Sequence, residues 1–169
     1  MLIRKASGEE MLKLWGYQNE KNASFTAQFF CRNIRSGNAV FYTIEHEGKL
    51  IGELYVFKEL EDHDFADGKT TAYLCAFRVK EEYRGKSLGS RLMKTALDEL
   101  KEEGFAHATI GVNPDEVQNV KLYRRLGFST KVKECFLDPC GFSADGTSVI
   151  DEAGWILLSK DLSSADEYC

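Results

Sequence analysis

The most constraining feature of the sequence is an apolar segment that runs directly into a basic turn and then into an amphipathic segment, between Thr71 and Leu100. The first part, residues 71–79, is nearly continuous in apolar residues, which is typical of a strand in the middle of a sheet. The last part predicts a helix, and Gly104 is placed to end it. Its residues at helical spacing are Leu88, Leu92, Met93, Ala96, Leu97 and Leu100. A strand, a basic turn and a helix in this order predict a helix N-terminus whose free amides can bind an anion.

The turn contains the tripeptide Gly85-Lys86-Ser87, which is also the end of the P-loop of nucleotide triphosphatases. A P-loop needs a second glycine five positions before Gly85, and Lys80 stands there. It also follows the first strand of a parallel sheet and needs a later strand that ends in an aspartate for magnesium, and the sequence offers neither convincingly. The turn therefore predicts an anion site that is not a P-loop.

Two short helices are expected before this unit. Ser7 and Glu10 stand three positions apart, in the capping-box pattern that begins a helix. A second helix covers residues 24–35, and Gly37 is placed to stop it. Its apolar stripe consists of Phe25, Phe29, Phe30 and Ile34.

A fourth helix is expected over residues 113–126, after the strand that follows Gly104. Asn113, Pro114 and Glu116 fit the N-cap, N1 and N3 positions of this helix, and Gly127 fits the C′ position. The expected strands are residues 1–6, 39–46, 50–60, 71–79, 105–112, 128–137 and 155–162. A glycine- and aspartate-rich loop from residue 138 to residue 154 separates the last two strands.

These elements predict a mixed α+β domain with a mainly antiparallel sheet of about six to seven strands, flanked by about four helices. A chain of 169 residues with 43% hydrophobic residues can build one core without disulfides or metals, so we expect a single domain over residues 1–169. No segment has the length and composition of a membrane span or a secretion signal, which favours a cytoplasmic protein without a membrane partner.

Charge and metal-ligating residues narrow the function further. A net charge of −5 argues against a nucleic-acid partner, for which a basic surface is expected. The five cysteines include no CxxC pair, and the three histidines lack the spacing of metal ligands, so no metal site is expected.

Two motifs resemble the GNAT superfamily of acyl-coenzyme A-dependent N-acyltransferases. The first is Arg84-Gly85-Lys86-Ser87-Leu88-Gly89, which is similar to the family's phosphate signature except that Ser87 replaces a glycine. The second is the segment that ends in Leu-Tyr-x-x-Leu-Gly-Phe at Leu122–Phe128. Each motif is weak alone, but their order and the elements between them make the resemblance specific. It implies a GNAT-like α/β sandwich and acetyl-CoA as cosubstrate.

The resemblance also implies which residues hold the coenzyme. Its pyrophosphate would lie on the turn and the helix N-terminus, at residues Arg84, Gly85, Lys86, Ser87, Leu88, Gly89 and Ser90. The Ser87 hydroxyl could contact a phosphate or only cap the helix. The backbone of Phe77 and Val79 would pair with the pantetheine arm, whether or not their side chains also belong to the core. Asn119 would bind the pantetheine or lie on the outer face of its helix.

Proton transfer has a clear candidate for the acid and a less clear one for the base. Tyr123 matches the family's tyrosine near the coenzyme sulfur, where a phenol can protonate a departing thiolate; otherwise it is a packed helix residue. Family members often carry a base where this chain has Tyr73 and Cys75, neither of which is basic near neutral pH. Glu53 could accept a proton directly or through water, unless it is merely solvated or paired. An acyl-cysteine at Cys75 has no recognisable histidine partner.

Two main hypotheses follow from these residues. The first is an N-acetyltransferase in which an amine attacks acetyl-CoA directly; the amine belongs to a small molecule, a peptide N-terminus or a lysine. The pocket for this amine would be formed by the two early helices, the hairpin of residues 39–60 and residues 138–153. The second is a non-catalytic module that binds acyl-CoA, and a nucleotide-binding ATPase is a third possibility. The sequence leaves the oligomeric state open, a homodimer included.

Overall fold

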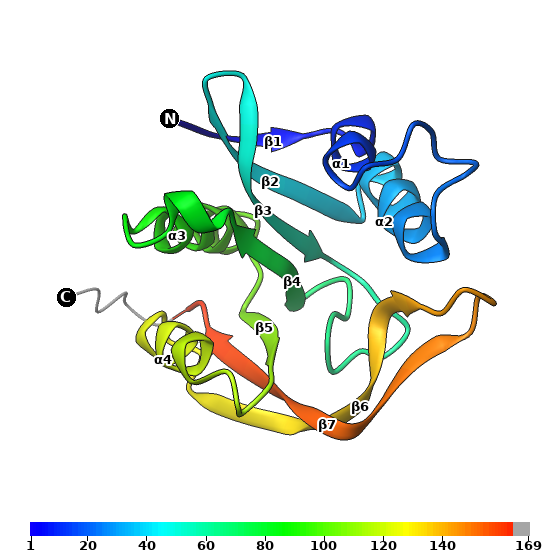
Figure 1. Cartoon of the computed structure of the whole chain (residues 1–169). Coiled ribbons are helices and arrows are strands. Elements are labelled where there is room, and N and C mark those ends of the chain that lie inside the picture. Colours follow the sequence, from blue (N-terminus) through cyan, green and yellow to red (C-terminus); the bar gives the residue numbers. More distant parts are fainter. Residues whose placement is uncertain (164–169) are drawn as a thin grey trace.

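The computed structural model describes residues 1–163 of the chain. Cys169 and the last part of the predicted domain lie outside the described residues. The elements are β1 (Leu2–Ala6), α1 (Gly8–Leu14), α2 (Phe25–Ser36), β2 (Ala39–His46), β3 (Lys49–Phe57), β4 (Thr71–Val79), the 3-10 turn η1 (Glu81–Tyr83), α3 (Leu88–Glu102), β5 (His107–Val112), α4 (Val117–Arg125), β6 (Thr130–Phe142) and β7 (Ser148–Asp161) (Figure 1). No helix in residues 1–163 is long and apolar enough to cross a membrane.

The seven strands form one sheet in the order β1-β2-β3-β4-β5-β7-β6. Only β4 and β5 run parallel, because α3 carries the chain back between them, and every other neighbouring pair is antiparallel. The predicted fold class, a mainly antiparallel mixed sheet with four helices, is confirmed. β4 lies at the centre of the sheet, as its continuous apolar sequence predicts.

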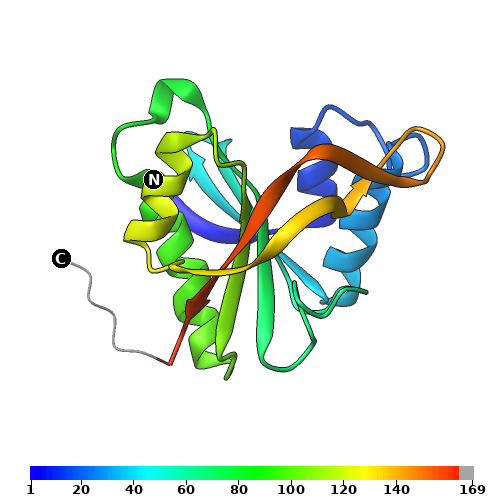
Figure 2. The same ribbon diagram turned by 90° about the horizontal axis from the view of Figure 1, so that it is seen from below.

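The helices cover the two faces of the sheet in pairs, which lie on opposite sides in both views (Figures 1 and 2). α3 and α4 bury their apolar residues in one core, together with residues such as Leu54, Leu74 and Ile110. α1 and α2 cover the other face, where Phe30, Tyr55 and Phe57 pack as an aromatic cluster. The strands β2, β3 and β4 therefore supply side chains alternately to two cores.

The predicted caps are mostly confirmed. Ser7 and Glu10 form the capping box of α1, and Gly37 ends α2 with a φ of 82°. Gly127 lies in the same left-handed region, with a φ of 99°, directly after the C-cap of α4. Phe25 was expected on the apolar stripe of α2, but its side chain is 46% exposed because it begins the helix at the edge of the core.

Two expectations about the second half of the chain are wrong. α4 begins at Val117, three residues after the predicted first helical residue Pro114, because the carbonyl of Asn113 closes a turn by accepting the backbone N–H of Glu116. Glu116 is the N-cap and makes no side-chain cap. The expected loop at residues 138–154 is mostly strand: β6 and β7 continue to Phe142 and back from Ser148, and register shifts absorb the glycine and proline residues.

The extended part of β6 and β7 forms a long arm that reaches across the molecule to α2 (Figures 1 and 2). Thr26 on α2 holds its tip, because its hydroxyl receives the N–H of Phe142 at 2.9 Å and donates to the carbonyl of Phe142 at 3.2 Å. The arm thus brings residues 138–151 to the same side of the sheet as α1 and α2.

Candidate active site

The site begins where β4 and β5 separate. Their pairing ends at Leu74 and Ile110, although β4 continues beside β3 to Val79 and β5 continues beside β7 to Val112. The two strands therefore diverge within the sheet and leave an opening between Cys75–Val79 and Gly111–Val112. Such an opening is what the expected pairing of the Phe77 and Val79 backbone with the pantetheine arm requires.

A β-bulge at Ala76 decides which way the diverging residues point. Ala76 has a φ of 51°, and the register with β3 shifts between Glu53 and Tyr55. Cys75 and Ala76 both pack on the α1–α2 side, whereas Phe77 packs against the α3 core. A bulge of this kind reverses the alternation of side chains beyond it. Without it, Phe77 would not reach α3.

The turn after β4 presents a helix N-terminus without a side-chain cap. Gly85 and Ser87 both lie in the left-handed region, with φ values of 80° and 60°, and Ser87 is the N-cap of α3. The first backbone bond of the helix runs from the N–H of Arg91 to the carbonyl of Ser87. The N–H groups of residues 88–90 therefore have no partner within the helix and can bind an anion.

A groove of about 860 Å³, here called the turn groove, lies beside this helix N-terminus. It is lined by Phe77, Arg78, Val79, Tyr83, Arg84, Gly85, Ser87, Leu88, Gly89, Ser90, Glu116, Gln118, Asn119, Leu122 and Arg125. The structure thus gathers every predicted coenzyme residue except Lys86, whose ammonium lies 5.9 Å from the centre of the Tyr83 ring. Arg84 is fixed by a 2.8 Å bond from its Nε to the carbonyl of Val79.

Several groove residues are absent from the sequence-based prediction. Gln118, Leu122 and Arg125 line the groove from α4, on the same face as Asn119, and their spacing of three to four residues was the signal that could have found them. Arg78 had no such signal, because its direction depends on the bulge at Ala76.

Tyr123 is buried on α4 and is not among the residues that line the turn groove. Burial, and next the carboxylate of Glu116, raise the pKa of Tyr123 to about 12. Its hydroxyl makes no hydrogen bond with another described residue, and its ring packs against Phe128. The phenol is therefore protonated near neutral pH, directly behind the groove wall that Glu116 forms.

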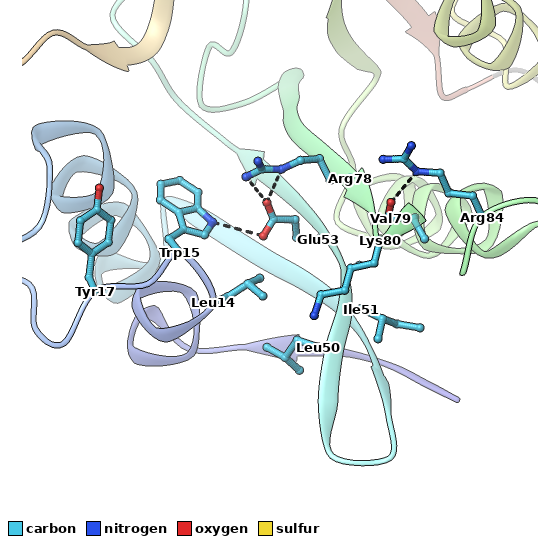
Figure 3. Close-up of a pocket in the computed structure, with 11 residues that line it drawn as sticks. Leu14, Trp15, Tyr17, Leu50, Ile51, Glu53, Arg78, Val79, Lys80 and Arg84 are labelled. Atoms are coloured by element: carbon cyan, nitrogen blue, oxygen red, sulfur yellow. Dashed lines mark hydrogen bonds and ion pairs between the residues drawn. The ribbon is translucent and has the colours of Figure 1, made fainter. Parts of the chain in front are cut away.

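Glu53 is the most connected side chain of the site (Figure 3). Its Oε1 receives bonds from Arg78, at 2.8 Å from Nε and 2.5 Å from Nη2. Its Oε2 receives longer bonds, at 3.3 Å from Trp15 Nε1 and 3.4 Å from the Tyr55 hydroxyl. Only 5% of Glu53 is exposed, and it forms part of the wall of a cavity of about 530 Å³ that Trp15, Arg78, Lys80 and Arg84 also line. The carboxylate is thus held in place by three side chains.

A further cavity, the arm cavity, lies between the diverging strands, α1, α2 and the β6–β7 arm and measures about 460 Å³. It is lined by Trp15, Thr26, Phe30, Tyr73, Cys75, Ala76, Arg78, Gly111, Val112, Asn113, Glu116, Asp138, Cys140, Val149, Asp151 and Trp155. Arg78 and Glu116 also line the turn groove, so the two spaces meet between these residues. Asp138, Cys140, Val149 and Asp151 line this cavity from strands and not from a loop. The β2–β3 hairpin, which was also expected to form the acceptor pocket, does not line it.

A helix N-terminus with free amides, arginines and an adjoining cavity is consistent with an enzyme that joins an anionic carrier to a second ligand. The model of the acetyltransferase (GNAT) family matches residues 7–128. The chain belongs to the GNAT acetyltransferase family. This family uses acetyl-CoA, and the diverging strands and the turn groove are the part of this GNAT chain that carries the resemblance.

Solved structures share the fold over nearly the whole chain. An aminoglycoside 6'-acetyltransferase type Ii has a TM-score of 0.65 at 16% identity, with 98% of this chain and 100% of that chain covered. A structure from Salmonella typhimurium, solved with its cofactor acetyl-CoA, has a TM-score of 0.64 at 15% identity, with 100% of this chain and 99% of that chain covered. A ribosomal-protein-alanine N-acetyltransferase from Brucella melitensis has a TM-score of 0.63 at 18% identity, covering 95% and 99%.

One curated relative is similar over a short segment. A mycothiol acetyltransferase from Corynebacterium aurimucosum is 38% identical over 57 residues, which are 34% of this GNAT chain and 19% of that protein. The match therefore spans about a fifth of the relative's length, and these similarities do not extend to its substrate.

Proposed function

We propose that the protein is an N-acetyltransferase that transfers the acetyl group of acetyl-CoA to a primary amine by direct attack. The observation that carries this proposal is the meeting of the turn groove and the arm cavity between Arg78 and Glu116. A carrier in the groove and an amine in the cavity would approach one another there, as a direct transfer requires.

The turn groove fits the coenzyme on three counts. The amides of residues 88–90 and the guanidinium of Arg84 suit a pyrophosphate. The lack of a Cβ at Gly89 leaves room beside the Phe77 ring, since such an atom would lie 2.7 Å from Phe77 Cζ. The backbone of Phe77 and Val79 faces away from β3 into the opening left by β5. When bound, acetyl-CoA supplies an acetyl group activated as a thioester.

Glu53 and Tyr123 are the residues proposed to move protons. Glu53 lines the cavity of about 530 Å³ and not the arm cavity, so it would accept the amine proton through a water molecule. That water would take the place of Trp15 or Tyr55 at Oε2, because these bonds are the longest ones that Glu53 accepts. Tyr123 holds a proton near neutral pH, as its pKa of about 12 requires, and its hydroxyl has no other partner among residues 1–163. It is therefore proposed as the acid for the departing thiolate.

We also propose that the protein acts in the cytoplasm. Cys31, Cys75, Cys135 and Cys140 are free thiols, which suits a reducing compartment. The acceptor classes that remain are a small amine, a peptide N-terminus and a lysine side chain, and a homodimer is compatible with each of them.

The test is a screen of amines with acetyl-CoA in which the released thiol is measured, including polyamines, aminoglycosides, amino acids and peptides. We expect turnover with at least one class. Separate titration of coenzyme A by calorimetry gives the affinity of the turn groove, and Mg-ATP is expected to compete poorly with it. Binding of coenzyme A without thiol release on any amine would contradict the proposed catalysis.

That negative result is what the second candidate, a non-catalytic acyl-CoA-binding module, predicts. Two observations favour it: both oxygens of Glu53 already accept bonds, and Tyr123 does not line the groove. A Tyr123→Phe variant separates the two functions, since a catalyst loses thiol release at unchanged coenzyme affinity.

A further inference from the structure

The arm cavity has an unusual balance of charge. Its wall contains three carboxylates, Glu116, Asp138 and Asp151, and none of them forms an ion pair with a described residue. The single cationic side chain of the wall, Arg78, is paired with Glu53, which lies outside the cavity. The cavity therefore presents excess negative charge to any molecule inside it.

The wall also contains aromatic rings from three parts of the chain. Trp15 and Phe30 come from the α1–α2 side and pack with their ring centres 5.1 Å apart, and Trp155 comes from β7. A Cβ atom on Gly111 would lie 2.4 Å from the Trp155 ring, so this glycine lets the ring lie flat against β5. Rings beside carboxylates favour a cationic ligand over a neutral one.

Tyr73 adds a hydroxyl group to the wall of the arm cavity. Its side chain lines the cavity although only 5% of the residue is exposed, and its hydroxyl makes no hydrogen bond with another described residue. The neighbouring Phe65 ring contacts it edge-on, with the ring centres 5.0 Å apart. Burial raises the pKa of Tyr73 well above its ordinary value, so the phenol is neutral and free to bond a ligand. No fully buried polar side-chain atom of residues 1–163 lacks a hydrogen-bond partner, so this hydroxyl opens onto the cavity, where a ligand can bond it.

From this cavity we infer that the acceptor is a small molecule with at least two cationic amines, one that reacts and one that is held by Asp138, Asp151 and Tyr73. The inference rests on the proposed acetyl transfer and names its substrate class. Because Glu116 lies where the cavity meets the turn groove, the reacting amine would be at that end. The second amine would lie beside the arm, which supplies Asp138 and Asp151. A volume of about 460 Å³ is enough for a diamine and small for a folded protein surface.

Two acceptors that differ by one amine test this directly: 1,5-diaminopentane and pentylamine. With saturating acetyl-CoA, we expect kcat/KM for the diamine to exceed that for the monoamine by about 10-fold or more, as a hydrogen bond to a charged group allows. The preference should decrease as salt is added, because unpaired carboxylates attract a dication less at high ionic strength. This salt series needs no variant.

Isosteric variants locate the second amine. Asp138→Asn and Asp151→Asn keep the bonds that these side chains accept from Cys140, Ala153 and Gly154, and remove only the charge. We expect each to lower the diamine preference several-fold, whereas Glu152→Gln, an exposed neighbour outside the cavity, leaves it unchanged. Thermal denaturation of each variant shows whether it is folded.

Calorimetric titration of both amines into the complex with coenzyme A separates this inference from the proposed function. Tighter binding of the diamine that depends on Asp138 and Asp151 in these titrations, together with no thiol release from acetyl-CoA in the turnover assay, would support the ligand class and contradict the catalysis. Equal binding and equal turnover of the two amines would overturn the inference and leave the acetyl transfer intact. Preference for a peptide over both amines would overturn it as well.

Discussion

Glu53 and Arg78 form a two-point ion pair, in which both Nε and Nη2 of the arginine contact Oε1 of the carboxylate. The Glu53 carboxylate is nearly buried, whereas the Arg78 side chain is 65% exposed. Arg78 lines the turn groove, the arm cavity and the cavity of about 530 Å³. The ion pair depends on the bulge at Ala76, which turns Arg78 toward β3. The carboxylate proposed to take the proton is therefore positioned by the same strand that opens for the coenzyme.

Glu53→Gln should reduce turnover without weakening coenzyme binding. The amide keeps the size of the side chain and its contact with Trp15, but it cannot accept the amine proton, so we expect kcat to fall by about 100-fold or more. Steady-state kinetics and calorimetry give the two quantities. Glu45→Gln, which alters another ion-paired carboxylate on β2, is the matched control. A normal kcat in Glu53→Gln would exclude the residue as the base.

Arg78→Ala should have a small effect on stability and a larger one on catalysis. Because the arginine is largely exposed, water can replace it, and we expect a loss of only about 1 kcal/mol in the free energy of unfolding. Urea denaturation measures this loss. A loss above about 3 kcal/mol would show that the pair is shielded from solvent in the manner of a buried one.

Ser87→Gly should stabilise the protein and preserve coenzyme binding. Ser87 has a φ of 60°, a conformation that costs an L-residue about 1–2 kcal/mol and glycine almost nothing. Part of this gain is offset by the greater freedom of glycine in the unfolded chain, so we expect about 1 kcal/mol. Urea denaturation measures the change. Ser87→Ala is the control, because it removes the hydroxyl and keeps the strain; complete loss of binding in Ser87→Gly would contradict the assignment of the turn groove.

Gly89→Ala should narrow the turn groove. The new methyl would lie 2.7 Å from Phe77 Cζ and 3.6 Å from a methyl of Val79, so the ring must move into the space proposed for the coenzyme. We expect coenzyme affinity, measured by calorimetry, to fall about 10-fold or more. Phe77→Leu on the same background removes the clash and should restore part of the affinity. If Gly89→Ala bound the coenzyme normally, the ring would not border its site.

The sequence predicts the turn well because the reasons are local. The positions of Gly85, Ser87 and Gly89 are read directly from the chain, and the amides they free belong to the same few residues. The spacing of apolar residues is likewise a local signal. Together with the order of the elements along the chain, it predicts the mixed sheet and the four helices. The start of α4 was misplaced because Asn113 and Pro114 suit a turn as well as a helix, and only the bond from Glu116 to Asn113 decides between them.

The arm cavity is less predictable because its parts are far apart in the chain. Tyr73, Glu116 and Asp151 meet only after β4 and β5 diverge and the arm folds back to α2. Glycines at residues 141, 146 and 154 made residues 138–154 resemble a loop, whereas the pairing of Leu137 with Ile150 extends the strands between them. Bulges have no clear sequence signature. The direction of the Arg78 side chain, which depends on the bulge at Ala76, is therefore not predictable from the sequence.

Tyr123→Phe should reveal the proton of the proposed acid through the pH dependence of stability. The folded pKa of about 12 exceeds the usual value of 10, so the neutral phenol stabilises the fold fully below pH 10, and this contribution is lost as the pH rises through 12. Two pKa units correspond to about 2–3 kcal/mol. Between pH 9 and pH 12, the free energy of unfolding of the parent should therefore decrease more than that of Tyr123→Phe. Other buried tyrosines, such as Tyr42 and Tyr55, titrate in both proteins and cancel in the difference.

At pH 7 the Tyr123→Phe variant should be folded and bind coenzyme A normally while thiol release falls. Parallel pH curves for the two proteins would mean that Tyr123 ionises with the ordinary pKa of an exposed phenol, which would contradict the effect of its burial. Unchanged thiol release in Tyr123→Phe would exclude Tyr123 as the acid.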